Sequence, residues 1–320
     1  MAGFLVNEPV QRALPWCLMS LGIAFGLLFP ELALQLEWLP FLASLFLFGM
    51  PHGAMDWVIT GRLSAETGVV GQLRAFVPYL LWMAASVLLL IFLPGVTVAA
   101  FMLLTVVHFG TADLLATGNG QSSLWRRTVF IAGRGCLILG PAFAFHTELS
   151  CKPFALVAGQ YPMTPGALTA VSSVALGFTI LGMVLASIHV ILRVREDPHG
   201  GLLDLVESLL ILALTALVTP LFAIGLFFIS THAYRHSVRL VSPPLGPPEA
   251  LGVPLWKRLA AMHVSCLGLL APTLLIILVW TWIQFGRLDA YSLTTVTIGF
   301  FIISTLPHHI LGLRLPAYRP

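Results

Sequence analysis

The sequence is poor in charged residues. Asp, Glu, Lys and Arg make up only 9% of its 320 residues, whereas a soluble domain carries about 25%. Together with a hydrophobic content of 58%, this shortage excludes an ordinary soluble domain and favours an integral membrane protein. No interval between the apolar runs is long enough to fold alone, so residues 1–320 are expected to form one membrane-embedded domain.

Cysteine is scarce as well, and the basic residues do not cluster. The four cysteines stand alone without a CxxC pair, so neither a disulfide framework nor a thiolate metal site is expected. The net charge of +3 is spread over the ends of apolar runs, which argues against nucleic acid as a partner. No small-residue cleavage site follows the first apolar run, which is therefore expected to remain as a helix.

Apolar runs of membrane-spanning length recur along the chain. A helix that crosses a bilayer needs about 20 apolar residues. The sequence predicts ten spans, at 12–30, 40–58, 75–93, 96–117, 128–146, 168–192, 202–218, 221–240, 259–285 and 290–312. Tight turns are expected at Pro94-Gly95 and Thr219-Pro220, between antiparallel helices. The predicted fold is an all-α polytopic bundle.

Lysine and arginine predict the orientation of these spans, because positive residues concentrate on the cytoplasmic side. With a cytoplasmic N-terminus, thirteen of them fall at inner ends and loops, and only Lys152 and Arg287 fall in outer loops. Both termini are therefore expected in the cytoplasm, in a multi-pass protein of the cell's inner (plasma) membrane. The proline-rich stretch 242–248 would form a cytoplasmic loop.

Four histidines fall at one depth in this arrangement. His52 lies in the second span, His108 in the fourth, and His232 and His236 in the eighth. At a rise of about 1.5 Å per residue, all four are expected roughly 6–14 Å from the cytoplasmic edge. His232 and His236 are four residues apart, so they share a helix face. Histidine is costly inside a membrane, so four histidines at one depth predict a functional site. Imidazole binds Zn, Cu, Fe and Ni, so the sequence indicates a metal site but does not identify the metal.

An aspartate follows each of the first two histidines. Asp56 lies one turn after His52, and Asp113 lies five residues after His108. Metal-bound histidines usually donate their second N–H to a carboxylate or a carbonyl, which fixes the tautomer. Asp56 and Asp113 are therefore expected to orient the ligands, on their own helix or on a neighbouring one.

Residues beside His52 and near the C-terminus bear on the same site. Pro51 and Gly53 predict a break or kink that leaves room for a ligand. His308 and His309 also fall near the inner face. For these two, a fifth ligand, a partner of the ligands and an interfacial residue all remain open.

Four short motifs, taken together and in this order, resemble the Brp/Blh family of bacterial and archaeal β-carotene dioxygenases. They are PHGAMD at 51–56, HFGTAD at 108–113, HAYRH at 232–236 and Pro307-His308, so the resemblance covers about residues 45–310. The family often shows Ser-Pro where this chain has Ala233-Tyr234.

The resemblance implies a membrane-embedded, non-haem Fe(II) enzyme. Such an enzyme uses O₂ to cleave the central 15,15′ double bond of β-carotene, and the two molecules of all-trans-retinal then serve a microbial rhodopsin. Carried over to this chain, the iron ligands would be His52, His108, His232 and His236. Asp56 and Asp113 match the acidic positions of the first two motifs.

Other classes of protein also fit a histidine-rich membrane bundle. A two-iron desaturase or hydroxylase needs HxxxH and HxxHH boxes, and this chain has one HxxxH and no HxxHH. A transporter could use the His and Asp residues as a proton relay. A carotenoid- or retinal-binding accessory protein without catalysis is the third alternative. Iron content and product analysis distinguish these classes.

Overall fold

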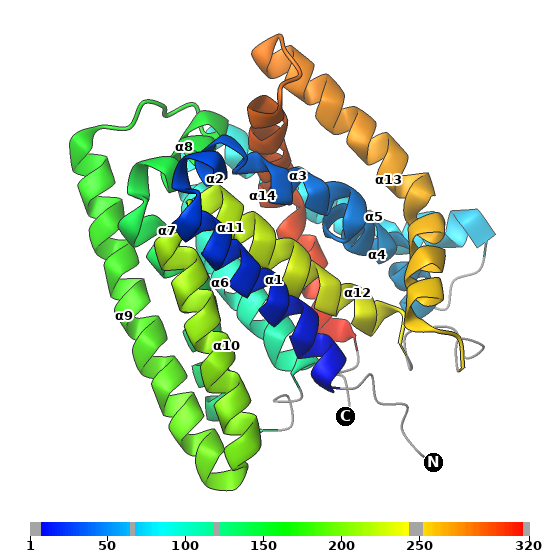
Figure 1. Cartoon of the computed structure of the whole chain (residues 1–320). Helices are drawn as coiled ribbons and strands as arrows, with labels where there is room; N and C mark the ends of the chain where they lie inside the picture. The colour runs from blue at the N-terminus through cyan, green and yellow to red at the C-terminus, as the bar shows by residue number, and fades with distance from the viewer. Residues whose placement is uncertain (1–7, 65–67, 118–121, 243–251, 316–320) are drawn as a thin grey trace.

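The computed structural model describes residues 8–64, 68–117, 122–242 and 252–315, and every regular element in these ranges is a helix (Figure 1). The first helices are α1 (Glu8–Leu28), α2 (Pro30–Gln35), α3 (Trp38–Leu47), α4 (Gly49–Ser64), α5 (Gly68–Phe92), α6 (Pro94–Ala116) and α7 (Leu124–Phe145). They are followed by α8 (Thr147–Val157), α9 (Pro165–Glu196), α10 (Pro198–Leu217), α11 (Pro220–Phe227), η2 (Phe228–Ala233), α12 (Tyr234–Leu240), α13 (Leu255–Phe285) and α14 (Ala290–Arg314).

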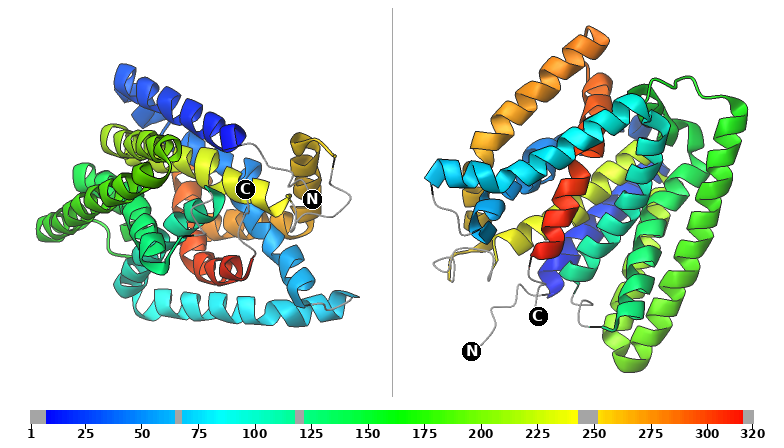
Figure 2. Two further views of the ribbon diagram at one scale, coloured as in Figure 1. Left: turned by 90° about the horizontal axis from the view of Figure 1, so that it is seen from below. Right: turned by 180° about the vertical axis from the view of Figure 1, so that it is seen from behind.

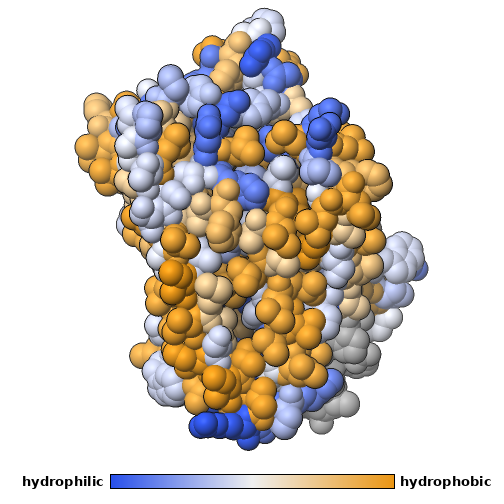
Figure 3. Space-filling view, turned by 60° about the vertical axis from the view of Figure 1, so that its left-hand side comes forward, coloured by the Kyte–Doolittle hydropathy of each residue, from blue (hydrophilic) through white to orange (hydrophobic). Residues whose placement is uncertain are grey.

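The outer surface of the bundle is apolar. Within the described ranges, nine helical segments are long and apolar enough to cross a membrane. Large hydrophobic side chains point outward along them, such as Phe92 at 74% and Ile283 at 77% exposure. Figure 3 shows a hydrophobic band between polar ends on one face. An apolar surface of this extent is stable only against lipid, so the predicted all-α polytopic bundle is confirmed.

The remaining expected span, 221–240, is divided into three short pieces. Helix α11 passes directly into the π-helical turn η2 and then into α12, so the segment from Pro220 to Leu240 is helical throughout. None of the three pieces alone is long enough to cross a membrane. Figures 1 and 2 show this segment in the centre of the bundle, with α9 at one edge and α13 at the other.

Proline begins the helix after each of the two expected turns. Helix α5 ends at Phe92 and α6 begins at Pro94, and α10 ends at Leu217 before α11 begins at Pro220. Proline suits the first turn of a helix because the N–H groups of that turn have no hydrogen-bond partner within the helix, so the missing N–H of proline costs nothing there. The chain turns back at both places, as predicted. The proline-rich stretch 242–248 lies, apart from its first residue, outside the described residues.

The two ends of the described chain lie on one side of the bundle. Helix α1 begins there and α14 ends there (Figure 1). An even number of membrane crossings gives this arrangement. Which side faces the cytoplasm stays a prediction from the positive-inside rule.

Helices α6 and α7 approach each other at glycines. A Cβ atom on Gly110 would overlap the carbonyl oxygen of Ile131, and one on Gly135 would overlap that of Val106. Small residues allow such close approach between membrane helices, which gain van der Waals contact from it. The contact holds α6, which carries His108, firmly against α7.

Candidate functional site

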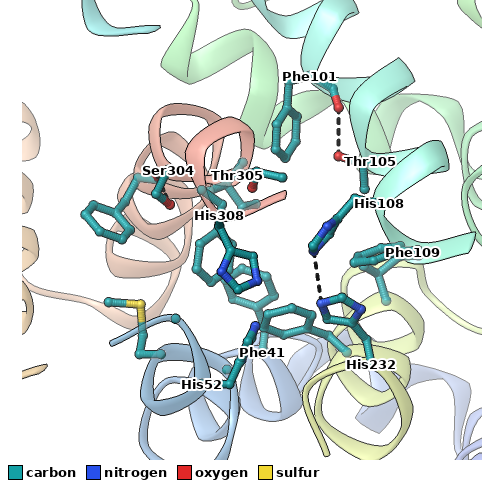
Figure 4. A pocket seen from close by; sticks show the side chains of 18 of the residues that line it. Phe41, His52, Phe101, Thr105, His108, Phe109, His232, Ser304, Thr305 and His308 are labelled. Atoms are coloured by element: carbon teal, nitrogen blue, oxygen red, sulfur yellow. Dashed lines mark hydrogen bonds between the residues drawn. The ribbon is translucent and has the colours of Figure 1, made fainter. Parts of the chain in front are cut away.

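The structure brings the four predicted histidines together and adds a fifth, His308. It also places His309 beside His108, with their Nδ1 atoms 3.3 Å apart. The ring of His52, on α4, lies 5.6 Å from that of His232 on η2, 5.2 Å from that of His236 on α12 and 5.1 Å from that of His308 on α14. The ring of His108, on α6, lies 4.8 Å from that of His232 and 5.3 Å from that of His308. Figure 4 shows four of these imidazoles facing one another from separate helices.

Local backbone features place two of the rings. The expected break near His52 falls at Phe48, between α3 and α4, so Pro51 lies in the first turn of α4, where proline is tolerated. The π-helical turn η2 contains His232 and ends just before α12. Such turns are frequent at functional sites, and here the rings of His232 and His236 remain 6.5 Å apart and nearly parallel.

Hydrogen bonds assign the tautomers of His52 and His308. Nδ1 of His52 donates to the carbonyl oxygen of Phe48 at 2.7 Å, and Nδ1 of His308 donates to Oδ2 of Asp56 at 2.7 Å. A neutral imidazole carries one N–H, so Nε2 of each ring is a free lone pair. This is the pattern of metal-binding histidines, whose other nitrogen is held by a carbonyl or a carboxylate.

The spacing of the remaining nitrogens fits a shared metal ion. Nε2 of His108 and Nε2 of His232 are 3.2 Å apart, and without a metal ion one of the two rings donates a hydrogen bond to the other. Two nitrogens bound to one ion at about 2.1 Å lie about 3.0–3.4 Å from each other. In the described part of the chain, however, no three His, Cys, Asp or Glu side chains form a complete metal-binding group. A third imidazole must therefore turn toward this pair to close a shell, and the ligand assignment stays a prediction.

Neither aspartate is bonded to the histidine that precedes it on its own helix, and the prediction also allowed a histidine on a neighbouring helix. Asp56 accepts hydrogen bonds from His308 and from the hydroxyl of Tyr79, the latter at 2.9 Å, and so orients a histidine from another helix. Asp113 does not contact His108. Its carboxylate pairs with Arg235 at 2.9 Å and with Arg134 at 3.4 Å.

A largely apolar cavity of about 330 Å³ opens beside the histidines. His52, His108, His232 and His308 line it, whereas His236 does not. Aromatic side chains form much of the wall, from Phe41, Phe76, Phe101, Phe109, Phe143, Phe154, Phe228, Phe300 and Phe301. Leu80 and Ile276 also line the cavity, and they are 49% and 57% exposed on the lipid-facing surface. Part of the cavity wall therefore lies at the apolar outer surface of the bundle.

Comparison with known proteins decides the family. The family model described as beta-carotene 15,15′-dioxygenase matches residues 43–315. The chain belongs to this family. It is 26% identical over 243 residues to the probable beta-carotene 15,15′-dioxygenase Blh of Halobacterium salinarum, which covers 72% of this chain and 69% of that protein. It is 24% identical over 281 residues to a beta-carotene 15,15′-dioxygenase of the uncultured marine bacterium 66A03, covering 84% of this chain and 90% of the other. No solved structure matches significantly.

This member of the dioxygenase family departs from the frequent family pattern at Tyr234, and the structure shows where that side chain lies. It is buried and packs edge-on against Phe48, with ring centroids 5.7 Å apart. Tyr234 does not line the cavity. The Tyr234 side chain therefore packs just before α4, in the segment that leads to His52, and forms no part of the cavity wall.

A second buried polar cluster lies next to the histidines and was not anticipated as a unit. It contains Arg12, Asp113, Arg134, Asp204, Glu207 and Arg235. Three arginines and three carboxylates balance in charge, as a cluster in a membrane bundle requires. The sequence feature that indicates such a cluster is the presence of single charged residues, such as Arg134 and Glu207, inside apolar runs.

Proposed function

We propose that this chain is a membrane-bound β-carotene 15,15′-dioxygenase, which cleaves the polyene at its central double bond to give two molecules of all-trans-retinal. The observation that carries the proposal is an apolar cavity whose wall includes a cluster of histidines and residues of the lipid-facing surface. The names of the family and of the two curated relatives support the same activity.

The metal in this proposal is Fe(II), held by His52, His108, His232 and His236. Four neutral imidazoles suit iron, and the 3.2 Å separation of two Nε2 atoms is compatible with a shared ion. Iron supplies the O₂ chemistry that closed-shell side chains lack. The two oxygen atoms of one O₂ account for the two aldehydes, so the overall reaction needs no added reductant.

The protein's own contribution is position. Aromatic and aliphatic walls bind a hydrocarbon chain and exclude water, and a long, near-symmetric polyene can be cut at one bond only if its register is held. Phe109 and Phe228 flank His232, with ring centroids 4.7 and 5.4 Å from its own, and form the cavity wall beside this histidine. Exposure of Leu80 and Ile276 favours entry of carotene sideways from the bilayer.

We further propose the cell's inner (plasma) membrane as the site of the reaction, with both termini in the cytoplasm. The product is a membrane-soluble aldehyde. A microbial rhodopsin, which binds retinal covalently, is the expected consumer.

The test is expression in a bacterium that accumulates β-carotene, followed by chromatography of the extracted retinoids. Retinal is expected to appear as carotene is lost, without apo-carotenals of other length. His199→Ala is the matched control, because His199 is exposed at the start of α10 and does not line the cavity. Unchanged carotene in membranes that contain the folded protein would overturn the proposal and leave a non-catalytic binder.

A further inference from the structure

His308 is placed like the predicted ligands although its role was left open by the sequence. It is buried, at 8% exposure, and lines the cavity together with His52, His108 and His232. Its ring lies 5.1 to 5.3 Å from those of His52, His236 and His108. The set of histidines that faces the cavity therefore includes His308.

The two nitrogens of His308 have different surroundings. Nδ1 donates to Asp56 at 2.7 Å, whereas Nε2 is buried and has no hydrogen-bond partner among the described residues. Leaving a buried polar atom without a partner lowers the stability of the fold by about 1–3 kcal/mol, so a bound ligand is expected at Nε2. In the neutral form of the ring, this hydrogen bond leaves a lone pair on Nε2, which can bind a metal ion.

A third residue completes the support of this ring. Tyr79, on α5, donates its hydroxyl to the same carboxylate oxygen of Asp56 at 2.9 Å. Asp56 on α4 therefore receives hydrogen bonds from two other helices, α5 and α14. A carboxylate held in this way orients an imidazole and increases the basicity of its free nitrogen.

We propose that His308 is a further donor to the metal ion, and that Asp56 and Tyr79 are its positioning residues. The inference rests on the proposed metal site and extends it beyond the four histidines that the family resemblance implies as iron ligands. It also explains why Asp56 turns to His308, and not to His52 one turn away on its own helix.

The experiment uses the purified full-length protein in lipid nanodiscs, with Co²⁺ as a spectroscopic probe of the metal shell. The visible bands of Co²⁺ report the number and kind of its ligands, so they respond to the loss of a donor. His308→Gly is expected to shift these bands and to weaken Co²⁺ binding at least tenfold. Free imidazole is expected to restore both, because it can occupy the space of the missing ring.

Two milder variants test the positioning residues. Asp56→Asn is expected to weaken Co²⁺ binding about 10- to 100-fold, as replacement of a ligand's partner usually does, while leaving the band positions close to those of the wild type. Tyr79→Phe is expected to act in the same direction and more weakly. His199→Ala serves as the control and is expected to change neither affinity nor spectrum.

The outcomes separate this inference from the proposed function. Wild-type protein that binds Co²⁺ and forms retinal, with an unchanged spectrum and affinity in His308→Gly, would overturn the inference alone. Wild-type protein that binds no metal and forms no retinal would overturn both. If His308→Gly does not fold, His308→Gln gives the same comparison, and a wild-type spectrum and affinity in that variant would also reject His308 as a donor.

Discussion

Arg235 donates a hydrogen bond to Asp113 over 2.9 Å, although the two residues are 122 positions apart in the chain. Arg235 lies between His232 and His236, and Asp113 lies five residues after His108. The pair therefore joins the two segments that carry three of the predicted ligands. Glu207 on α10 accepts two further hydrogen bonds from the same guanidinium, each at 2.8 Å.

Removal of this guanidinium tests how much Arg235 contributes to the stability of the folded protein. Arg235→Met leaves the buried carboxylates of Asp113 and Glu207 without a main partner, and breaking a buried ion pair costs about 3–5 kcal/mol. We expect a large drop in the thermal unfolding temperature of the purified protein and a parallel loss of retinal formation. Arg126→Met is the matched control, because its partner Glu196 is exposed and water or headgroups replace the contact. Equal shifts in the two variants would contradict the prediction.

The proposed histidine ligands are tested one at a time. His52→Ala, His108→Ala, His232→Ala and His236→Ala are each expected to abolish retinal formation and to lower bound iron, while the protein still inserts into the membrane. The physical reason is that an open metal site needs all its donors to hold the ion in place. Metal analysis of purified protein and chromatography of retinoids provide the readouts. Full activity in the His108 or His232 variant would exclude that residue as a ligand.

The cavity is tested by filling it. Gly53 lines the cavity, and a Cβ atom built on it meets no other atom within 4 Å. Gly53→Phe is therefore expected to fold and to lower the rate of carotene cleavage at least tenfold by occupying substrate space beside His52. Gly177→Phe makes the same change on an exposed position of α9 and is expected to keep normal activity. Similar activity of the two variants would show that carotene does not use this part of the cavity.

Orientation is tested by labelling single introduced cysteines in intact cells. With both termini in the cytoplasm, Arg287→Cys, between α13 and α14, faces outward, and His199→Cys, at the start of α10, faces inward. A membrane-impermeant thiol reagent is expected to label the first variant in intact cells and the second only after lysis. Three of the four native cysteines are buried, so the wild type supplies a low background. The reverse pattern would place both termini outside.

Several features follow from the sequence alone because their causes are local. Long apolar runs must form helices in lipid, since no water is present there to satisfy the backbone. The common rise of an α-helix then places His52, His108, His232 and His236 at one depth, and the structure does bring these four rings together. The motif order was sufficient to indicate the dioxygenase family, which the comparisons established.

Other features depend on how each helix is rotated and which neighbour it meets. Asp56 lies one turn from His52 in the sequence, yet its partner is His308, 252 residues away. Asp113 likewise turns to Arg235 and Arg134. Periodicity along one helix shows which residues share a face, but it does not show which helix packs against that face. The neighbouring helix is determined by packing over the whole bundle. The sequence therefore determined the helices, the depth of the histidines and the family, and only the tertiary structure decided which carboxylate holds which ring.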